Sequence, residues 1–158
     1  MENKSFETYT DTIIKDFKDP VFQSAFKAYF TELGIEVKDW NGLFQEISEE
    51  DGNTAIVRKT GEGKTIGFIM YKPIEFTSWF FEETRGFIRE FWICKEYRNA
   101  GHGSELLGLA EEAFRSQGIN SFILTTDTAE EFYIKHGYKK DPDCKAKNKD
   151  EVFVKVAY

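Results

Sequence analysis

The sequence predicts one domain of mixed α and β structure, in which helices come first and strands then alternate with helices. Three observations support this fold class. A stripe of apolar side chains at helical spacing follows Asp19-Pro20 near the start of the chain. Two strand-like runs flank the turn residues 60–64. Two later strand-like runs, residues 86–94 and 121–126, are each followed by a segment with helical periodicity.

The first helix is expected to begin at Asp19, with Pro20 in its first turn, and to end at Gly34. The preceding stretch from Ser5 to Phe17 is ambiguous between a strand at residues 6–10 and a helix at residues 12–17. A second short helix is expected over residues 40–47. The apolar stripe that would face the core from the first helix consists of Phe22, Ala25, Phe26, Tyr29, Phe30 and Leu33.

The central part of the chain is typical of a β-hairpin. Residues 54–59 and 65–71 form its two strands, and a connection over residues 77–85 leads to a strand around Phe87. The turn contains Gly63-Lys64-Thr65, which copies the end of a Walker A loop. That motif requires Gly where this chain has Arg58, and it requires a helix where a strand follows, so a P-loop is excluded. The last strand is expected over residues 152–156, after a charged loop at residues 139–151.

Composition restricts the function classes. A chain of 158 residues is one domain by the usual prior and is long enough for a full core. An apolar content of 41% and an aromatic content of 16% indicate a folded protein. The net charge of −7 argues against nucleic acid as a partner, because binding a polyphosphate needs an excess of Lys and Arg.

The cysteines and the N-terminus bear on location. Cys94 and Cys144 are in neither a C-x-x-C pair nor a metal-ligand spacing, so no metal site is expected and both are interpreted as reduced thiols. The first six residues lack the apolar run of a signal peptide, and no apolar stretch is long enough to span a membrane. A cytoplasmic protein without a membrane partner is therefore expected.

The most informative stretch is the loop Arg98-Asn99-Ala100-Gly101-His102-Gly103-Ser104, which joins a strand to a helix. Backbone N–H groups at a helix N-terminus lack intrahelical acceptors, and the helix dipole favours negative charge there, so the loop is expected to bind a phosphate. A dinucleotide fingerprint is excluded because its third glycine falls on Leu106. A nucleophile elbow is excluded because Ser104 directly follows Gly103. The remaining pattern is R-x-x-G-x-G.

A second segment follows at residues 121–138. The strand at 121–126 leads into a short helix, for which Thr128 and Glu131 suggest a capping box and Gly137 a left-handed stop. Together the two segments resemble the GCN5-related N-acetyltransferase (GNAT) family, whose usual form in the second segment is N-x-x-A-I-x-F-Y-x-x-x-G-F. Four of its positions are kept and the last is Tyr138; the chain departs from it at Thr126 and Glu130. The kept positions are Ala129, Phe132, Tyr133 and Gly137.

The resemblance covers about residues 86 to 138 and implies the fold and the acyl donor. The implied fold is a mixed, mostly antiparallel twisted sheet of six to seven strands with about four helices. The implied donor is acetyl-CoA. Backbone groups of Phe91, Trp92 and Ile93 would bind its pantetheine arm, and the loop from Arg98 to Ser104 would bind its pyrophosphate. Thr126 would supply a polar contact, although the family often has Asn at this position. Within the loop, the backbone N–H of His102 is expected to matter and its ring to be exposed.

The resemblance also implies the chemistry, which is acetyl transfer to a primary amine by direct attack in a ternary complex. Glu90 is the candidate base for the amine, with a surface or ion-paired Glu as the alternative, and N–H groups near Ile93 would stabilise the oxyanion. Tyr133 would protonate the departing thiolate, with core packing as the alternative. A non-catalytic acyl-CoA-binding module is the competing function.

The sequence indicates the acceptor and the oligomeric state less specifically than the donor. Trp79, Phe80 and Phe81 are candidates for an acceptor pocket, with core capping or a dimer contact as the alternative interpretations. A small-molecule amine and a peptide amine are both compatible with the sequence. A homodimer is possible, since dimers are common in the family.

Overall fold

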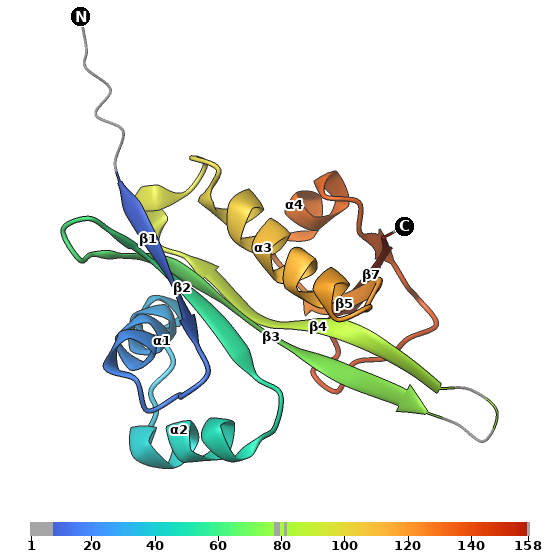
Figure 1. Cartoon of the computed structure of the whole chain (residues 1–158), viewed down its shortest axis with the longest axis horizontal. Helices are drawn as coiled ribbons and strands as arrows, with labels where there is room; N and C mark the ends of the chain where they lie inside the picture. The colour runs from blue at the N-terminus through green and yellow to red at the C-terminus, as the bar shows by residue number, and fades with distance from the viewer. Residues whose placement is uncertain (1–7, 78–79, 81, 158) are drawn as a thin grey trace, which may run out of the picture. The chain divides into compact units, whose positions relative to one another are not determined.

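The computed structural model describes residues 8–77, 80 and 82–157. Its described residues form seven strands, four α-helices and one 3₁₀ helix (Figure 1). In chain order these are β1 (Tyr9–Ile14), α1 (Pro20–Leu33), α2 (Trp40–Glu49), β2 (Thr54–Thr60), β3 (Thr65–Thr77), β4 (Glu82–Ile93), η1 (Lys95–Tyr97), α3 (His102–Ser116), β5 (Ser121–Thr126), α4 (Glu130–Lys135), β6 (Lys139–Lys140) and β7 (Glu151–Val156). The predicted mixed fold class and the order of its main elements are confirmed.

The strands follow the order β1-β2-β3-β4-β5-β7-β6. The chain divides into two compact units, and β3 and β4 contribute residues to both. Unit 1 consists of Met1–Met70 and Glu90–Leu106, and unit 2 of Tyr71–Arg89 and Leu107–Tyr158.

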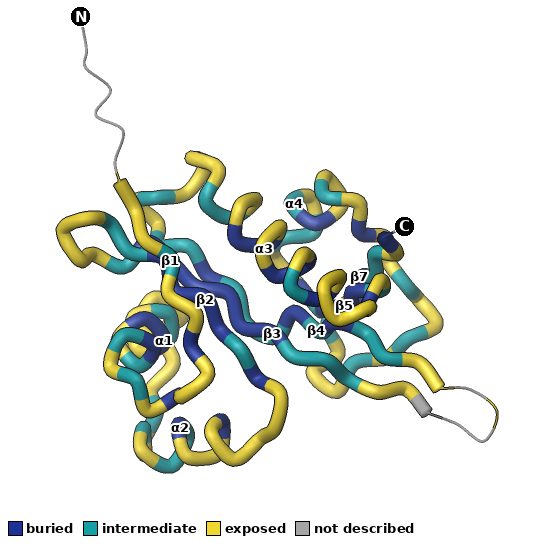
Figure 2. Tube along the Cα trace, in the orientation of Figure 1, coloured by how far each residue is buried: buried dark blue, intermediate teal, exposed yellow. Residues whose placement is uncertain are grey.

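In unit 1, α1 and α2 pack against β2 and the first part of β3. The α1 helix begins as expected, because the Asp19 side chain accepts a hydrogen bond from the Val21 N–H at 2.8 Å, and it ends at a left-handed Gly34 with φ 71°. Figure 2 shows that buried residues are concentrated along β2. The core cluster contains Ile14, Phe17, Phe22, Ala25, Phe26, Phe44, Ile47, Ala55, Val57, Phe68, Met70 and Trp92.

Two expectations for unit 1 need correction. The ambiguous stretch before α1 forms a strand, because Tyr9–Ile14 pairs antiparallel with β2 from Tyr9↔Thr60 to Ile14↔Ala55; the helix alternative at residues 12–17 is wrong. Leu33 does not face the core. Its side chain lies in the last turn of α1 and is 51% exposed.

In unit 2, β5 lies between β4 and β7. It pairs parallel with β4 through Gly86↔Phe122 and Phe87↔Ile123, and antiparallel with β7 along its whole length. The short strand β6 pairs with β7. Phe114 of α3 packs on Phe122 of β5, with ring centroids 5.7 Å apart. The core of this unit therefore lies between α3 and β5.

Strand structure in unit 2 extends further than the sequence indicated. The expected connection over residues 77–85 is shorter, because β3 runs to Thr77 and β4 begins at Glu82. Lys139 and Lys140, expected in a loop, form β6. Of the three candidate pocket aromatics, Trp79 and Phe81 lie outside the described residues. Phe80 is 88% exposed, so it does not cap a core.

Candidate active site

The predicted phosphate loop lies in unit 1, between the end of β4 and the start of α3. The chain leaves β4 at Ile93, passes through η1 and enters α3 at His102. Two residues of the loop have left-handed backbones: Asn99 with φ 64° and Gly101 with φ 91°. Left-handed residues next to ordinary ones turn successive N–H groups toward one concave side, which is the geometry of an anion-binding nest. Among side chains, asparagine tolerates this conformation well, and glycine has no side chain to strain it.

The start of α3 supplies the donors of this nest. The first hydrogen bond of the helix runs from the Glu105 N–H to the Gly101 carbonyl oxygen at 3.1 Å. The ladder of α3 therefore offers no acceptor to the N–H groups of His102 and Gly103. These two amides are candidate ligands of an anion, as the sequence predicted.

Arg98 has protein partners in this structure. Its Nε donates to the Ile93 carbonyl oxygen at 2.9 Å, and its Nη2 lies 2.5 Å from Glu32 Oε2 on α1. The same carboxylate oxygen accepts a hydrogen bond from Trp92 Nε1 at 3.0 Å. The side chain that was expected to contact phosphate thus fastens the loop to the end of β4 and to α1.

The candidate pantetheine strand is held closely against β3. Gly67 lies so near the Trp92 carbonyl oxygen that a Cβ at this position would overlap with it, and that Cβ would lie 2.9 Å from Ile93 Cα. The Cys94 N–H donates to the Ile66 carbonyl oxygen at 2.7 Å. Of the three candidate residues, Trp92 is buried, whereas Phe91 and Ile93 are partly exposed. Sequence reasoning missed Gly67, for which an isolated glycine within a strand was the available signal.

Glu90 lies on the same strand, in unit 1. Its carboxylate accepts a hydrogen bond from the Tyr29 hydroxyl of α1 at 3.0 Å, and the residue is partly exposed. A carboxylate with solvent access can exchange a proton with water. The geometry therefore suits a base acting directly or through water.

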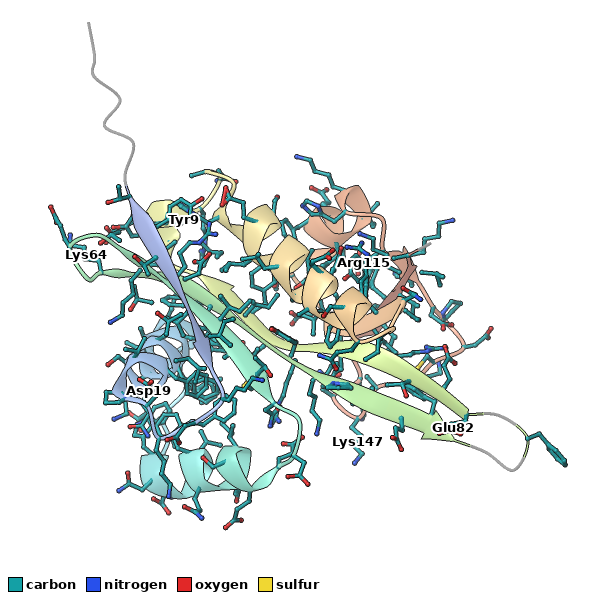
Figure 3. All side chains as sticks on the ribbon, in the orientation of Figure 1. Tyr9, Asp19, Lys64, Glu82, Arg115 and Lys147 are labelled. Carbon is teal, nitrogen blue, oxygen red and sulfur yellow. The ribbon has the colours of Figure 1, made fainter. Side chains whose placement is uncertain are left out.

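The ring of His102 is not simply exposed, as the sequence analysis expected. Its Nδ1 lies 3.0 Å from Arg58 Nη1, and its ring meets the Tyr9 ring edge-on at 5.5 Å. Tyr9 projects from β1, where Figure 3 labels it. The expectation failed because Arg58 was interpreted only as a residue that breaks the Walker A pattern, and nothing in a single sequence pairs it with a residue 44 positions later.

Arg58 is the centre of a charged network in unit 1. Its side chain is 2% exposed, and it donates to Asp11 through Nε at 2.7 Å and Nη2 at 2.9 Å, and to Glu105 through Nη1 at 2.7 Å. Burial alone would lower the Arg58 pKa, but the hydrogen bonds to Asp11 and Glu105 outweigh burial and raise it, so the guanidinium stays charged. Hydrogen bonds from Tyr9 and Arg58 hold the pKa of Glu105 below its usual value.

Unit 2 contains the other two candidate site residues. Tyr133 of α4 is 7% exposed, and burial raises the pKa of its hydroxyl, so this group keeps its proton at neutral pH. Thr126 is 8% exposed, and its Oγ1 accepts a hydrogen bond from the Ala129 N–H at 3.0 Å. This bond corrects the predicted capping box at Thr128: α4 has Ala129 as its N-cap, without a side-chain cap. The left-handed stop at Gly137 is confirmed, with φ 92°.

Each unit thus gathers part of the predicted site. Unit 1 carries Glu90, the β4 edge and the loop, and unit 2 carries Thr126 and Tyr133. Sequence reasoning missed the residues that support the loop in unit 1, which are Tyr9, Asp11, Glu32, Arg58, Gly67 and Glu105.

Comparison with known proteins is consistent with the predicted family. Residues 13–138 match the family model described as Acetyltransferase (GNAT) family. No curated protein matches the sequence significantly.

Solved structures share the fold at low sequence identity. An acetyltransferase of the GNAT family from Staphylococcus aureus is 16% identical, with a TM-score of 0.69, over 94% of this chain and 100% of that chain. A predicted acetyltransferase from Clostridium acetobutylicum, with acetyl-CoA, is 15% identical, with a TM-score of 0.73, over 88% and 95% of the two chains. Arabidopsis thaliana NAA60, in complex with a bisubstrate analogue, is 14% identical, with a TM-score of 0.67, over 96% and 100%.

Among the described residues, no helix combines the length and apolar character needed to cross a membrane.

Proposed function

Because the chain belongs to the acetyltransferase (GNAT) family, we propose that it transfers an acetyl group from acetyl-CoA to a primary amine by direct attack in a ternary complex. The observation that carries the proposal is the loop before α3. An R-x-x-G-x-G sequence there has left-handed backbones at Asn99 and Gly101 and leads directly into a helix N-terminus. This combination suits the pyrophosphate of a CoA thioester, because it presents backbone donors to a dianionic group without burying a counter-charge.

The donor would be bound by residues of both segments of the sequence. The loop residues Arg98, Asn99, Ala100, Gly101, His102, Gly103 and Ser104 are assigned to the pyrophosphate, and backbone groups of Phe91, Trp92 and Ile93 to the pantetheine arm. Thr126 is assigned a polar contact. Arg98 would exchange Glu32 for a phosphate oxygen when the donor binds, since a guanidinium recognises both groups with the same donors.

The reaction requires one proton acceptor and one proton donor. An alkylammonium has a pKa near ~10.4 and is mostly protonated at neutral pH, so Glu90 takes a proton from it, directly or through water. The free amine nitrogen then forms a bond to the thioester carbon, and N–H groups near Ile93 stabilise the oxyanion. When the C–S bond breaks, the thiolate sulfur takes the proton of the Tyr133 hydroxyl. The nitrogen gives up the second proton of the attacking amine, which restores the neutral Tyr133 directly or through water, and Glu90 releases its own proton to solvent. The products are an acetamide and CoA as a free thiol.

The acceptor is proposed only as a class. A small-molecule amine and the amine of a peptide both fit the chemistry, and the net charge of −7 favours a cationic one. Cys94 and Cys144 are free thiols, which fits the proposed location in the cytoplasm.

The proposal is tested by measuring thiol release from acetyl-CoA with a panel of small amines and peptides. Turnover on at least one amine is expected. Glu90→Gln and Tyr133→Phe should each lower kcat by about 10²-fold or more, because general acid and base groups contribute about that much. Glu82→Gln, an exposed carboxylate at the start of β4, and Tyr71→Phe, another buried phenol, serve as matched controls and should keep full activity.

The same assay separates catalysis from simple binding. Acetyl-CoA binding without turnover on any amine, together with wild-type behaviour of the two variants, would favour a non-catalytic acyl-CoA-binding module. A bulky residue at Gly103 should abolish donor binding, and unchanged affinity in that variant would contradict both functions.

A further inference from the structure

One edge of the Arg58 guanidinium is bound by Asp11, and its remaining nitrogen faces the donor loop, the predicted phosphate loop from Arg98 to Ser104. It projects from β2, is 2% exposed, and holds Asp11 of β1 with two nitrogens, at 2.7 Å and 2.9 Å. Two parallel N–H donors on one carboxylate fix the plane of the guanidinium. The position of the third nitrogen, Nη1, is therefore set by the β1-β2 pair.

Nη1 contacts the first turn of α3 at two points. It donates to Glu105 Oε2 at 2.7 Å and lies 3.0 Å from His102 Nδ1. An arginine can only donate, so Nδ1 must accept, which requires a neutral ring with its proton on Nε2. The contact thus specifies both the charge and the tautomer of His102.

Two aromatic rings enclose the same imidazole. Tyr9 covers the Arg58 guanidinium at 4.0 Å, meets the His102 ring edge-on, and donates its hydroxyl to Glu105 at 2.8 Å. The Tyr97 ring of η1 also meets the His102 ring edge-on, with the two ring centroids 6.3 Å apart. The groups that face His102 are thus a cation from β2, a carboxylate from its own helix, and two phenols from β1 and η1.

We propose that Arg58 is a positioning residue for the donor loop and that the neutral ring of His102 is the acceptor through which it acts. This inference rests on the proposed function for the identity of the ligand. His102 carries one of the two amides that would bind the pyrophosphate, and Glu105 lies in the same helical turn, so the network fixes these amides before the donor arrives. Preorganisation of this kind raises affinity because less ordering remains to be done on binding.

The same arrangement makes donor binding sensitive to acid. A protonated His102 carries a second donor at Nδ1, which faces the fixed guanidinium and cannot accept from it. The imidazolium must then turn away, although Glu105 would attract it. Acid that protonates this ring therefore breaks the link between the loop and Arg58, and the affinity for CoA should fall.

The first test needs no ligand. Nitrogen NMR of the protein labelled with ¹⁵N-histidine reports ring tautomers, and the chain contains only two histidines, His102 and His136. His136→Asn assigns the spectrum. At about pH 7.5 the His102 ring should be in the neutral Nε2–H form, and Arg58→Lys should change it, because one ammonium cannot hold Asp11 and His102 together. A ring that is protonated at Nδ1 would overturn the inference.

The second test compares CoA affinity among variants by calorimetry. His102→Leu removes the acceptor and should weaken CoA binding about 5–10-fold, the size expected for the loss of one ordinary hydrogen bond. His102→Asn keeps an oxygen acceptor that does not titrate and should bind within about twofold of the wild type at neutral pH. If Arg58→Lys does not fold, His102→Leu and His102→Asn still test the contact between Arg58 and His102.

The pH profile distinguishes positioning from a merely structural role. On acidification the wild type should lose affinity relative to His102→Asn, and this ratio cancels the titration of the phosphates of CoA itself. Equal affinity of wild type and His102→Leu, or a ratio that does not change with pH, would overturn the inference and leave the proposed function intact. A wild-type protein that binds no CoA would overturn the proposed function and the inference with it.

Discussion

Gly67 on β3 lies directly against the carbonyl oxygen of Trp92 on β4, so closely that any Cβ at position 67 would overlap with that oxygen. The obstacle is backbone and cannot rotate away. Because Trp92 and Ile93 form the candidate pantetheine edge, this glycine sets where that edge lies relative to β3.

Gly67→Ala should therefore weaken acetyl-CoA binding as well as lower stability. The added methyl forces β3 and β4 apart by a few tenths of an ångström or more, and overpacking of this kind costs about 1–3 kcal/mol. Calorimetric CoA affinity and thermal unfolding measure the two effects. Gly108→Ala is the control, since a Cβ there has open space, and it should be neutral or stabilising through helix propensity. Unchanged affinity in a folded Gly67→Ala variant would exclude the β4 edge as a donor contact.

Gly86→Ala tests the core of unit 2 in the same way. Its Cβ would overlap with the ring of Phe114, which is fully buried on α3. The variant should be destabilised by about 1–3 kcal/mol in urea unfolding. Leu is smaller than Phe and relieves the overlap. Gly86→Ala should therefore cost less stability when it is added to Phe114→Leu than when it is made in the wild type. Additive effects of the two substitutions would contradict a direct clash.

Parts of the fold could be predicted from short stretches of the sequence, and one such prediction failed. Local signals sufficed for the Asp19-Pro20 helix start, the hairpin around residues 60–64 and the strand-loop-helix at Arg98 to Ser104, because each depends on neighbours in the chain. The capping box at Thr128 failed although its spacing is correct, since Thr126 supplies the hydroxyl that accepts from Ala129.

The supports of the candidate site were not predictable for a different reason. Arg58 meets Asp11, His102 and Glu105, which lie 47, 44 and 47 positions away in the sequence. Such contacts depend on strand register and on which face of β2 points inward, and a single sequence specifies neither for a charged residue in a mixed run. The loop could be identified from its motif, whereas the network that holds it could be found only in three dimensions.

Glu111 is a buried charge in unit 2, and its removal should be costly. The carboxylate is 4% exposed, accepts from the Tyr138 hydroxyl at 2.8 Å and pairs with Lys155 at 2.8 Å. Glu111→Gln leaves Lys155 without its counter-charge, and a loss of about 2–3 kcal/mol is expected because Lys155 is partly exposed and can regain water. Glu112→Gln, next in the sequence but 71% exposed, should change stability by less than about 0.5 kcal/mol. Similar unfolding midpoints for the two variants would show that the Glu111 network contributes little.

Alkaline pH should destabilise unit 2 through its buried tyrosines. Burial raises the pKa of both Tyr133 and Tyr138, and the charge and hydrogen bond of Glu111 raise that of Tyr138 further. A folded-state pKa above the unfolded value of about 10 gives stability that is complete below that value and is lost as pH rises above it. Ultraviolet titration should show fewer than the chain's seven tyrosines ionising before unfolding, whereas all should titrate together in denaturant. Full ionisation in the folded protein near pH ~10 would contradict the assigned burial.

Glu32 should compete with the donor for Arg98. Its carboxylate holds Arg98 Nη2 at 2.5 Å, and the same oxygen accepts from the Trp92 indole at 3.0 Å. In Glu32→Gln, the amide oxygen can still accept from Trp92, but the charge that draws Arg98 away from a phosphate is removed. CoA affinity should therefore increase about threefold, within the range of partly exposed ion pairs, and the gain should shrink at high salt. Glu62→Gln, at the exposed hairpin turn, controls for the change in net charge. If Glu32→Gln instead weakens CoA binding while thermal stability is unchanged, Glu32 holds Arg98 in its binding position rather than competing for it.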